Sequence, residues 1–445
     1  MLKFGTDGVR GVANLDLTPE VALALGRAAA RVLGGWRFVV GRDTRLSGPL
    51  LEAALVAGLA SEGAQVTTIG VAPTPAVAWL AAADGVAGAV ISASHNPFED
   101  NGVKLFAAGG RKLSAAVEAA LEAELHALLS HADVGPPRTG DAVGAVVDGT
   151  ADVERWAGSV LASIDGRRLD GVRVVADCAN GAASAAAPRV LRELGATVVV
   201  LHEDPDGTNI NARCGSTHPE DLQREVVRLG ADVGIAFDGD ADRMLAVDAG
   251  GRLIDGDQII AVAAIDRRAR GRLAQDTVVI TVMTNLGFRL GMAEHGIDVL
   301  EVPVGDRHVL EALTDRDLTL GGEQSGHVIF ADLATTGDGL LTAVQLLDVV
   351  GRSGRPLAEL ADAAMTRLPQ VLHNVRVADK GLDVMAELAD DIASVEDELG
   401  DHGRVLIRSS GTEALMRVMV EAPTATQAEA AAARLVAAVE RLDSD

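Results

Sequence analysis

A strand–loop–helix pattern that occurs three times along the chain restricts its fold more than any other feature. In each copy, a short run rich in β-branched residues leads into a polar or glycine-containing loop and then into a helical stretch. The runs cover 37–40, 172–176 and 277–282, and helices are expected at 49–62, 185–194 and 288–295. Strands that alternate with helices build sheets covered by helices on both faces. The sequence therefore predicts three consecutive α/β domains, and the long spacing between copies argues against a solenoid.

The C-terminal part of the chain has a different pattern. We expect strands at 372–377, 405–407 and 415–420, and a helix at 383–398. A last helix should begin at Thr424, since Thr424 and Gln427 have the spacing of a capping box. This indicates a smaller, separate α+β domain. The expected domains are 1–152, 153–252, 253–368 and 369–445.

The charge of the chain excludes several classes of protein. It has 64 acidic and 39 basic residues, which gives a net charge of −25. Because nucleic-acid phosphates and anionic lipids repel such a surface, we expect no nucleic-acid partner and no membrane partner. Only four of the basic residues are lysines (Lys3, Lys104, Lys112 and Lys380). A GC-rich genome would explain the arginine-to-lysine ratio but not the acidic excess, so we favour a halophilic source with a salty cytosol.

Other compartments are disfavoured by local features. The N-terminus lacks the apolar segment of a signal peptide, and the most apolar stretch, 68–91, is interrupted by Pro73, Pro75 and Asp84. The two cysteines, Cys178 and Cys214, cannot build a disulfide framework or a four-ligand zinc site. We therefore expect a cytoplasmic protein.

The most informative motif is the acidic loop Asp238-Gly-Asp240-Ala-Asp242-Arg243, which follows the apolar run 233–237. Ligands of α/β sheets bind at the carboxyl ends of strands, where this loop should lie. Three carboxylates at alternate positions can converge on a hard cation and leave room for a phosphate oxygen, which suits Mg²⁺. A solvated acidic turn fits less well, because three close carboxylates repel one another without a cation.

A second motif, Ile91-Ser-Ala-Ser94-His95-Asn96-Pro97, follows another apolar run. Ser94 and His95 lack the G-x-S-x-G surroundings of a hydrolase nucleophile, and adjacent residues rarely form a nucleophile–base pair. A loop serine that carries a phosphoryl group would fit if a cation stood nearby. The alternative is an ordinary Asn-Pro turn.

Three further loops could bind a phosphosugar. Arg408-Ser-Ser410-Gly-Thr412, with Arg417 beyond it, could hold an anion, although a hairpin turn would look similar. The loop Gly321–His327 offers side chains that can hydrogen-bond sugar hydroxyls, although it could be a surface loop. The N-terminal Gly5–Gly11 segment, with Arg10, is a weaker anion-binding pattern.

In this order, the loops resemble the α-D-phosphohexomutase family over the whole chain. The motifs are FGTDGVRG, ASHNP, DGDADR, GEQSGH and SGTEALMR. The resemblance implies three α/β domains with mixed sheets and a smaller fourth domain around a central cleft. ISASHNPFEDNG, NINARCGSTHPE, VGDRHV and GGEQSGH resemble the branch that acts on glucosamine phosphates, with the mannose and glucose phosphate branch as the alternative. Departures from the family pattern are Ala241 for Gly, Ser409 and Ala414 for Pro, and His308 for Tyr.

The resemblance also implies a mechanism. Ser94 would carry a phosphoryl group, give it to a hexosamine monophosphate and recover a phosphoryl group from the 1,6-bisphosphate intermediate, which also serves as activator. The product would feed UDP-N-acetylglucosamine synthesis. One Mg²⁺ per chain would be held by Ser94, Asp238, Asp240 and Asp242. The implied substrate-binding residues are Arg243, Glu323, Ser325, Arg408, Ser410, Gly411, Thr412 and Arg417.

Two residues are candidates for the general base that accepts the hydroxyl proton. Lys104 and His327 both match the family's positions for a general base, Arg10 would bind phosphate oxygens, and His95 would orient the serine loop. The partner is a small phosphosugar, and the protein could be a monomer or a homodimer. Two other classes stay possible: a phosphatase or kinase with Asp238 as nucleophile, and a sugar-phosphate sensor without turnover.

Overall fold

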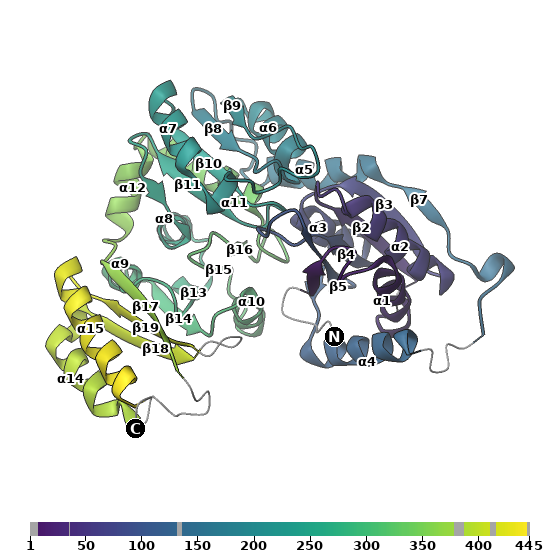
Figure 1. Cartoon of the computed structure of the whole chain (residues 1–445). Helices are drawn as coiled ribbons and strands as arrows, with labels where there is room; N and C mark the ends of the chain where they lie inside the picture. The colour runs from purple at the N-terminus through teal and green to yellow at the C-terminus, as the bar shows by residue number, and fades with distance from the viewer. Residues whose placement is uncertain (1–7, 35, 131–135, 378–386, 410–414, 443–445) are drawn as a thin grey trace. The chain divides into compact units, whose positions relative to one another are not determined.

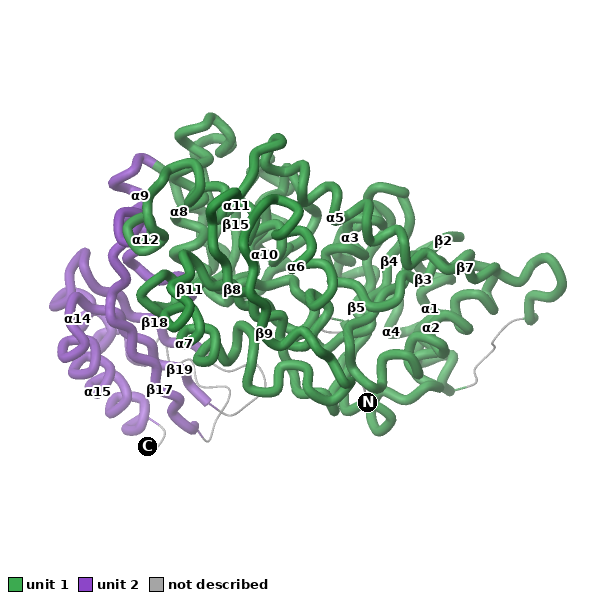
Figure 2. The backbone as a smooth tube through the Cα atoms, turned by 90° about the horizontal axis from the view of Figure 1, so that it is seen from above, with its two compact units in different colours: residues 1–282, 297–361 green, residues 283–296, 362–445 purple. Residues whose placement is uncertain are grey.

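The computed structural model describes residues 8–34, 36–130, 136–377, 387–409 and 415–442. The chain divides into two compact units. Unit 1 contains residues 1–282 and 297–361, and unit 2 contains residues 283–296 and 362–445 (Figure 2). Each unit is described by itself. No described helix is long and apolar enough to cross a lipid bilayer.

The first sheet of unit 1 has the order β1-β5-β4-β2-β3-β7, with β6 paired to β5 (Figure 1). Strands β2, β3, β4 and β7 are mutually parallel, whereas β5 is antiparallel to both of its neighbours β1 and β4. Its strands are β1 (Val9–Val12), β2 (Arg37–Arg42), β3 (Gln65–Val71), β4 (Ala87–Ile91), β5 (Asp100–Ala107), β6 (Arg111–Lys112) and β7 (Val146–Asp148). The expected mixed sheet is therefore present.

Helices cover both faces of this sheet. Phe38 and Val40 of β2 share one apolar cluster with Leu25, Leu55 and Leu121 of α1, α2 and α4. The opposite face meets α3, because a Cβ on Gly41 would touch the α3 residue Val77. The helices are α1 (Pro19–Val32), α2 (Gly48–Ser61), α3 (Thr74–Asp84) and α4 (Ala115–Leu129). Thr18 and Ser114 cap α1 and α4 by accepting backbone N–H bonds.

Two further sheets complete unit 1. The second has the order β12-β11-β10-β8-β9, and the third has the order β14-β13-β15-β16. The second sheet consists of β8 (Arg173–Asp177), β9 (Thr197–Leu201), β10 (Val233–Phe237), β11 (Met244–Asp248) and β12 (Leu253–Ile254). The third consists of β13 (Thr277–Thr281), β14 (Asp298–Val302), β15 (Leu320–Gly322) and β16 (Val328–Phe330). The associated helices are α5 (Val153–Ala162), α6 (Ala183–Glu193), α7 (Glu220–Leu229), α8 (Gly256–Ala269), α10 (Asp306–Asp315) and α11 (Gly339–Ser353).

Unit 2 is built on a small antiparallel sheet of order β17-β19-β18. Its core joins strand residues such as Val418 and Ile407 to Leu435 of α15 and Val395 of α14. The strands are β17 (Gln370–Arg376), β18 (Arg404–Ser409) and β19 (Leu415–Glu421). The helices are α9 (Leu286–Glu294), α14 (Ala389–Leu399), α15 (Ala425–Leu442) and the end of α12 (Leu357–Ala364), which begins in unit 1.

The predicted elements agree with this architecture within a few residues. The predicted helix at 49–62 is α2, and one half of the capping box is present, because Gln427 N donates to Thr424 Oγ1 at 3.3 Å. The described part of the helix predicted at 383–398 is α14 (Ala389–Leu399), and residues 378–386 lie outside the described part of the chain. The sequence did not predict that the first three α/β regions would share one compact unit.

Candidate active site

The acidic loop of unit 1 begins where the buried strand β10 ends. Asp238, Asp240 and Asp242 are all buried, and each offers an oxygen within 4.8 Å of the others. Burial and the two neighbouring carboxylates hold the pKa of Asp238 well above its usual range. Burial alone would also raise the pKa of Asp240, but Lys104 and a hydrogen bond from Thr74 lower it. The loop thus concentrates carboxylates whose side chains are buried from solvent.

Ser94 contacts this loop directly. Its Oγ donates a hydrogen bond of 2.6 Å to Asp238 Oδ2, although the two residues are far apart in the sequence. The backbone of Ser94 has φ +52°, the left-handed region that costs a non-glycine residue roughly 1–3 kcal/mol. Such a conformation persists only where neighbouring groups enforce it. The strain therefore indicates a loop whose shape is fixed for the serine.

Arg45 enforces that shape. Its fully buried guanidinium donates to the carbonyl oxygens of Ser94 at 2.9 Å and Asn96 at 2.8 Å, and to Asp100 O at 3.0 Å. Its Nε donates to Asp43 Oδ2 at 2.8 Å. One buried arginine thus satisfies several carbonyl groups of the serine loop at once.

The serine loop has two further supports. Asn211 Nδ2 donates to Ser94 O at 2.9 Å and to Asn96 O at 3.1 Å. Ser92 Oγ accepts from Ser94 N at 3.0 Å and donates to Asp43 Oδ2 at 2.5 Å. Ser92 supports the loop from within, directly after β4, whereas Asn211 reaches it from the segment between β9 and α7.

Lys104 projects from β5 toward the carboxylates. Its Nζ lies 2.7 Å from Asp240 Oδ2 and 3.2 Å from Asp242 Oδ2, and the side chain is only 8% exposed. The ammonium group therefore supplies part of the counter-charge that the buried acidic loop requires. It lies at the centre of the site, where the sequence placed one of the two possible bases.

Three more predicted residues surround Ser94. His95 Nδ1 is 3.4 Å from Ser94 Oγ and 3.5 Å from Arg243 Nη1. Burial and the positive charges of Arg243 and Arg10 lower the pKa of His95. Arg10 lies on β1 opposite Gly102, where an added Cβ would meet the arginine's own side chain. The neutral imidazole and the two guanidinium groups make an environment suited to a dianionic phosphate.

His327 is placed differently from the other predicted base. It is 2% exposed, and its Nδ1 and Nε2 lie 3.7 Å from Asp242 Oδ1 and 3.5 Å from Asp306 Oδ2. Burial opposes its protonation, but these two carboxylates raise its pKa. Asp306 in turn contacts Lys112. His327 is thus enclosed within a chain of charged groups that ends at the acidic loop.

Glu323 and Ser325 follow β15 in the loop of Gly321–His327. Glu323 Oε1 accepts a 3.1 Å hydrogen bond from Gly305 N, and Ser325 is exposed. Gly326 has φ +90°, and a Cβ there would lie 2.3 Å from Met244 O. The glycine therefore lets this loop pass close to the start of β11, next to the acidic loop.

The residues of the acidic loop fit a hard divalent cation. Asp240 Oδ1 and Asp242 Oδ1 are buried and have no hydrogen-bond partner within the described parts of the chain. Lys104 occupies the Oδ2 atoms of both residues and leaves the Oδ1 atoms available. Because all the ligands are oxygen atoms, the site suits Mg²⁺ better than a soft transition metal.

The predicted anion cradle belongs to unit 2. Arg408 of β18 and Arg417 of β19 face each other across the antiparallel ladder. Burial and the charge of Arg417 lower the pKa of Arg408. Ser410, Gly411 and Thr412 lie outside the described residues. Two arginines at one end of a hairpin are suited to bind a phosphate.

Sequence reasoning missed the residues that support the site. Arg45, Asp43, Thr74 and Asn211 were not predicted, although Arg45 and Asp43 belong to the polar loop after the first strand. The signal was available, because Asp-x-Arg at the carboxyl end of a strand is unusual for a solvated loop. It could not reveal that the arginine would be fully buried.

Comparison with known proteins gives consistent matches along the whole chain. Domain I of the phosphoglucomutase/phosphomannomutase family matches residues 1–131, domain II matches 155–251, domain III matches 255–368 and the C-terminal domain matches 372–438. A phosphoglucosamine mutase of Frankia casuarinae is 56% identical, with 98% of this chain and 97% of the relative covered. One of Acidothermus cellulolyticus is 55% identical, with 99% and 96% covered.

Solved structures show the same fold. A phosphoglucomutase/phosphomannomutase family protein from Burkholderia thailandensis has a TM-score of 0.80 and 27% identity, with 100% of this chain and 97% of that chain covered. An N-acetylphosphoglucosamine mutase of Aspergillus fumigatus, in complex with GlcNAc-6P and magnesium, has a TM-score of 0.70 and 21% identity, with 100% and 96% covered. The second likeness supports the fold alone.

Proposed function

The chain belongs to the phosphoglucomutase/phosphomannomutase family, and we propose from this premise that it interconverts glucosamine 6-phosphate and glucosamine 1-phosphate. It is a mutase, an isomerase whose substrate is a small phosphosugar. The support for the glucosamine substrate is identity of 52–56% to phosphoglucosamine mutases over nearly the full chain. The observation that carries the reaction is the 2.6 Å contact of Ser94 Oγ with the buried acidic loop.

In this proposal Ser94 carries the phosphoryl group. Its Oγ lies among Asp238, His95 and Arg243, so a phosphoryl group there meets one metal-binding loop and one guanidinium. Ser94, Asp238, Asp240 and Asp242 would hold one Mg²⁺ per chain. When bound, Mg²⁺ neutralises charge that develops on the transferred group.

We assign the proton transfer to Lys104. Its Nζ lies at the acidic loop, and the strand that carries it, β5, pairs with the strand that leads into the serine loop. His327 is enclosed between two carboxylates, so we propose that it positions Asp242 rather than exchanging protons with the substrate. His95 orients Ser94, and Arg10 and Arg243 bind the oxygens of the transferred phosphate.

The rest of the substrate would be held by two loops. Glu323 and Ser325 are proposed to contact sugar hydroxyls. Arg408, Ser410, Gly411, Thr412 and Arg417 are proposed to bind the phosphate that does not react. A hexosamine 1,6-bisphosphate would be both the intermediate and the activator that rephosphorylates Ser94. The proposed domains are 1–152, 153–252, 253–368 and 369–445.

The substrate is tested by comparing kcat/KM for glucosamine, mannose and glucose 6-phosphates under one set of conditions. We expect glucosamine 6-phosphate to be preferred. A preference for mannose or glucose phosphate would place the chain in the phosphomannomutase/phosphoglucomutase branch. Chelation with EDTA should abolish activity, and added Mg²⁺ should restore it.

The phosphoryl carrier is tested by labelling. Incubation with ³²P-labelled hexosamine 1,6-bisphosphate should label Ser94, and Ser94→Ala should lower turnover about 10³-fold or more. Ser61→Ala is a matched control, since its hydroxyl bonds only Gly58 O on α2. Label on Asp238 instead would support a phosphatase or kinase, and binding without turnover would support a sensor.

We further propose that the acidic surface is adapted to a salty cytosol. The net charge of −25 destabilises a compact chain when salt is low, because screening is weak. The free energy of unfolding should therefore rise from low to molar KCl. Full stability and activity without salt would contradict this assignment.

A further inference from the structure

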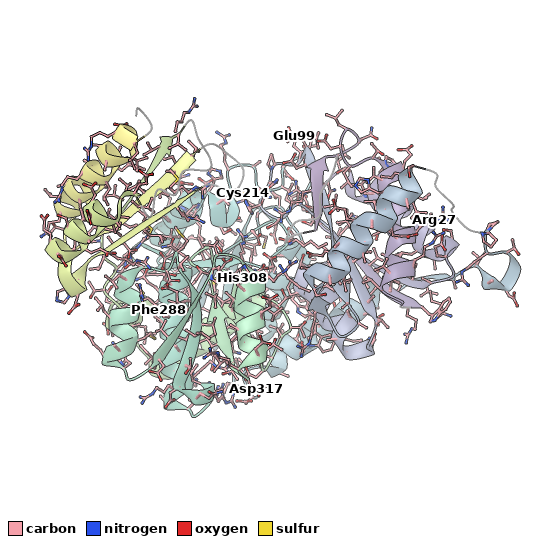
Figure 3. The ribbon with its side chains drawn as sticks, turned by 90° about the horizontal axis from the view of Figure 1, so that it is seen from below. Arg27, Glu99, Cys214, Phe288, His308 and Asp317 are labelled. Atoms are coloured by element: carbon pink, nitrogen blue, oxygen red, sulfur yellow. The ribbon has the colours of Figure 1, made fainter. Side chains whose placement is uncertain are left out.

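Three metal-binding side chains of different chemistry gather outside the active site. Asp177 is the last residue of β8, and His202 directly follows the neighbouring parallel strand β9. Cys214, labelled in Figure 3, lies in the segment between β9 and α7. One carboxylate oxygen, one imidazole nitrogen and the sulfur all lie within 4.8 Å of one another. Parallel strands bring these groups together because their carboxyl ends meet at one edge.

The backbone directs all three side chains toward one point. Asp177 is oriented by two amide donors, Ala179 N and Gly215 N, both at 2.9 Å. His202 has φ +51°, a left-handed conformation that is strained for a residue other than glycine. Gly215, next to Cys214, has φ +71°, and a Cβ there would lie 2.4 Å from Phe237 O. Glycine at this position keeps Cys214 close to the sheet.

An ordinary Asp–His ion pair does not account for the arrangement. His202 Nδ1 lies 3.0 Å from Asp177 Oδ1, yet it is buried and has no hydrogen-bond partner among the described residues. The contact with Asp177 also raises the pKa of His202, so an Asp–His pair accounts for two of the three groups. The third member is a sulfur atom that neither group needs. A shared cation would satisfy nitrogen, oxygen and sulfur together.

Electrostatics at the cluster also favour a cation. Burial and the charges of Asp177 and Asp221 together raise the pKa of Cys214 to about 12. Asp221 Oδ2 lies 3.7 Å from His202 Nε2. Without a metal the thiol keeps its proton. A divalent ion is attracted by the carboxylates and stabilises the thiolate, so binding releases the thiol proton to water.

We propose that Asp177, His202 and Cys214 bind Zn²⁺, with water or Asp221 at the fourth position. Sulfur, imidazole and carboxylate are the ligands of tetrahedral zinc, whereas the acidic loop offers oxygen alone. Zinc bonds of about 2.0–2.3 Å place tetrahedral ligand atoms about 3.3–3.8 Å apart. The cluster must therefore contract by up to about 1.5 Å, which the partly exposed ring of His202 allows. The sequence excluded zinc because it counted cysteines only; the fold adds the other ligands.

The site would fix a loop that serves the serine. Asn211 lies three residues before Cys214; its backbone N donates to Ala179 O at 2.9 Å, and its side chain donates to Ser94 O. Asn180 N, in turn, donates to His202 O at 2.7 Å. Zinc would join the end of β8 to both ends of the segment that carries Asn211. Its role is structural and does not depend on which hexose phosphate is the substrate.

The test uses the full chain, stripped of metal with EDTA and titrated with Co²⁺. Wild type should show a thiolate-to-cobalt charge-transfer band in the near ultraviolet, because Cys214 becomes a ligand. Cobalt at the acidic loop gives no such band, since that loop has no sulfur. Cys214→Ser should lose the band, and Cys178→Ser, which changes the other buried cysteine, should keep it.

Zinc itself gives the second measurement. Metal analysis after dialysis against Zn²⁺ should find zinc in wild type, and the affinity should fall at least tenfold in Cys214→Ser and in His202→Gln. His202 is partly exposed, so His202→Gln is expected to fold even where Cys214→Ser does not. Absence of the cobalt band in wild type, or its persistence in Cys214→Ser, would overturn the proposal. Equal zinc affinity of wild type and His202→Gln would do the same.

Discussion

The acidic loop of unit 1 and the arginine hairpin of unit 2 both concentrate charge of one sign, but they differ in whether opposite charges lie beside them. In unit 1, the buried carboxylates of Asp240 and Asp242 already contact Lys104. In unit 2, Arg408 and Arg417 stand opposite each other, and Arg417 Nε has no hydrogen-bond partner in the described part of the chain. Like charges in cross-strand positions destabilise a sheet. Lys104 therefore compensates part of the negative charge of the acidic loop, whereas the two arginines of the hairpin repel each other and favour binding of an anion.

This difference determines how strongly the acidic loop would bind a cation and the hairpin an anion. A cation that enters the acidic loop must share carboxylates that Lys104 already contacts, so its binding is partly an exchange. An anion at the hairpin is attracted by both arginines and also reduces the repulsion between them, so both effects favour its binding. The following predictions break or sharpen this contrast, in order of decreasing effect.

Removing the internal cation of unit 1 should have the largest effect. Lys104→Met leaves the buried carboxylates without their nearest counter-charge, so the free energy of unfolding should fall by about 3–5 kcal/mol. Turnover should also be lost, because we assign proton transfer to Lys104. Urea unfolding with and without Mg²⁺ checks this, and Mg²⁺ should stabilise the variant more than wild type. Equal stability of wild type and variant would show that the compensation is not needed.

Arg45→Met should destabilise unit 1 by a similar or slightly smaller amount, about 3 kcal/mol. It leaves Asp43 and several carbonyls of the serine loop buried without a donor. The matched control is Arg155→Met, whose exposed pair with Asp84 should be worth under about 1 kcal/mol. A smaller effect at Arg45 than at Arg155 would contradict the supporting role.

Asp338 of unit 1 is buried, and its hydrogen-bond donors Trp156 Nε1 and Leu341 N are neutral. Burial raises its pKa to about 6. In the unfolded chain the pKa of an aspartate carboxyl group is about 3.9. The free energy of unfolding should therefore fall as pH rises from about 4 to 6 and then stay level. The stability difference between wild type and Asp338→Asn should change by up to about 3 kcal/mol over that window. Denaturant unfolding at several pH values measures it, and a constant difference would refute it.

Arg417→Gln in unit 2 should have the smallest effect on ligand-free stability. Relief of repulsion with Arg408 should leave stability unchanged or raise it by less than about 1 kcal/mol. Loss of a charge-assisted phosphate contact should nevertheless lower kcat/KM roughly 10- to 100-fold. Arg434→Gln, which removes the exposed ion pair between Arg434 of α15 and Glu398 of α14, is the control and should leave kcat/KM unchanged. Marked destabilisation by Arg417→Gln would erase the contrast between the units.

Local pattern was sufficient to predict much of the fold and the centre of the site. The acidic loop and the serine loop each follow an apolar strand, and their proximity was implied by the family resemblance, since β4 and β10 belong to different sheets. The α/β class and the smaller C-terminal domain were also predicted, because the order of expected strands and helices changes after about residue 369.

Long-range burial could not be read from the sequence. Arg45 looks like a loop arginine, and only the fold shows that it is buried against the serine loop. His327 looked equivalent to Lys104 as a base, but the structure encloses it between Asp242 and Asp306. The zinc ligands share no motif, because β8, β9 and a later loop supply one each.

The supports of Ser94 have a consequence for the order of folding. Arg45 is 49 residues away, Asn211 is 117 and Asp238 is 144. Contacts between distant parts of a chain require large loops to close, and they form slowly. A refolding chain should therefore recover its helical circular dichroism before it recovers turnover. Until the second sheet docks on the first, the nucleophile has no fixed geometry, and a truncated chain that lacks the second sheet should have no partial activity.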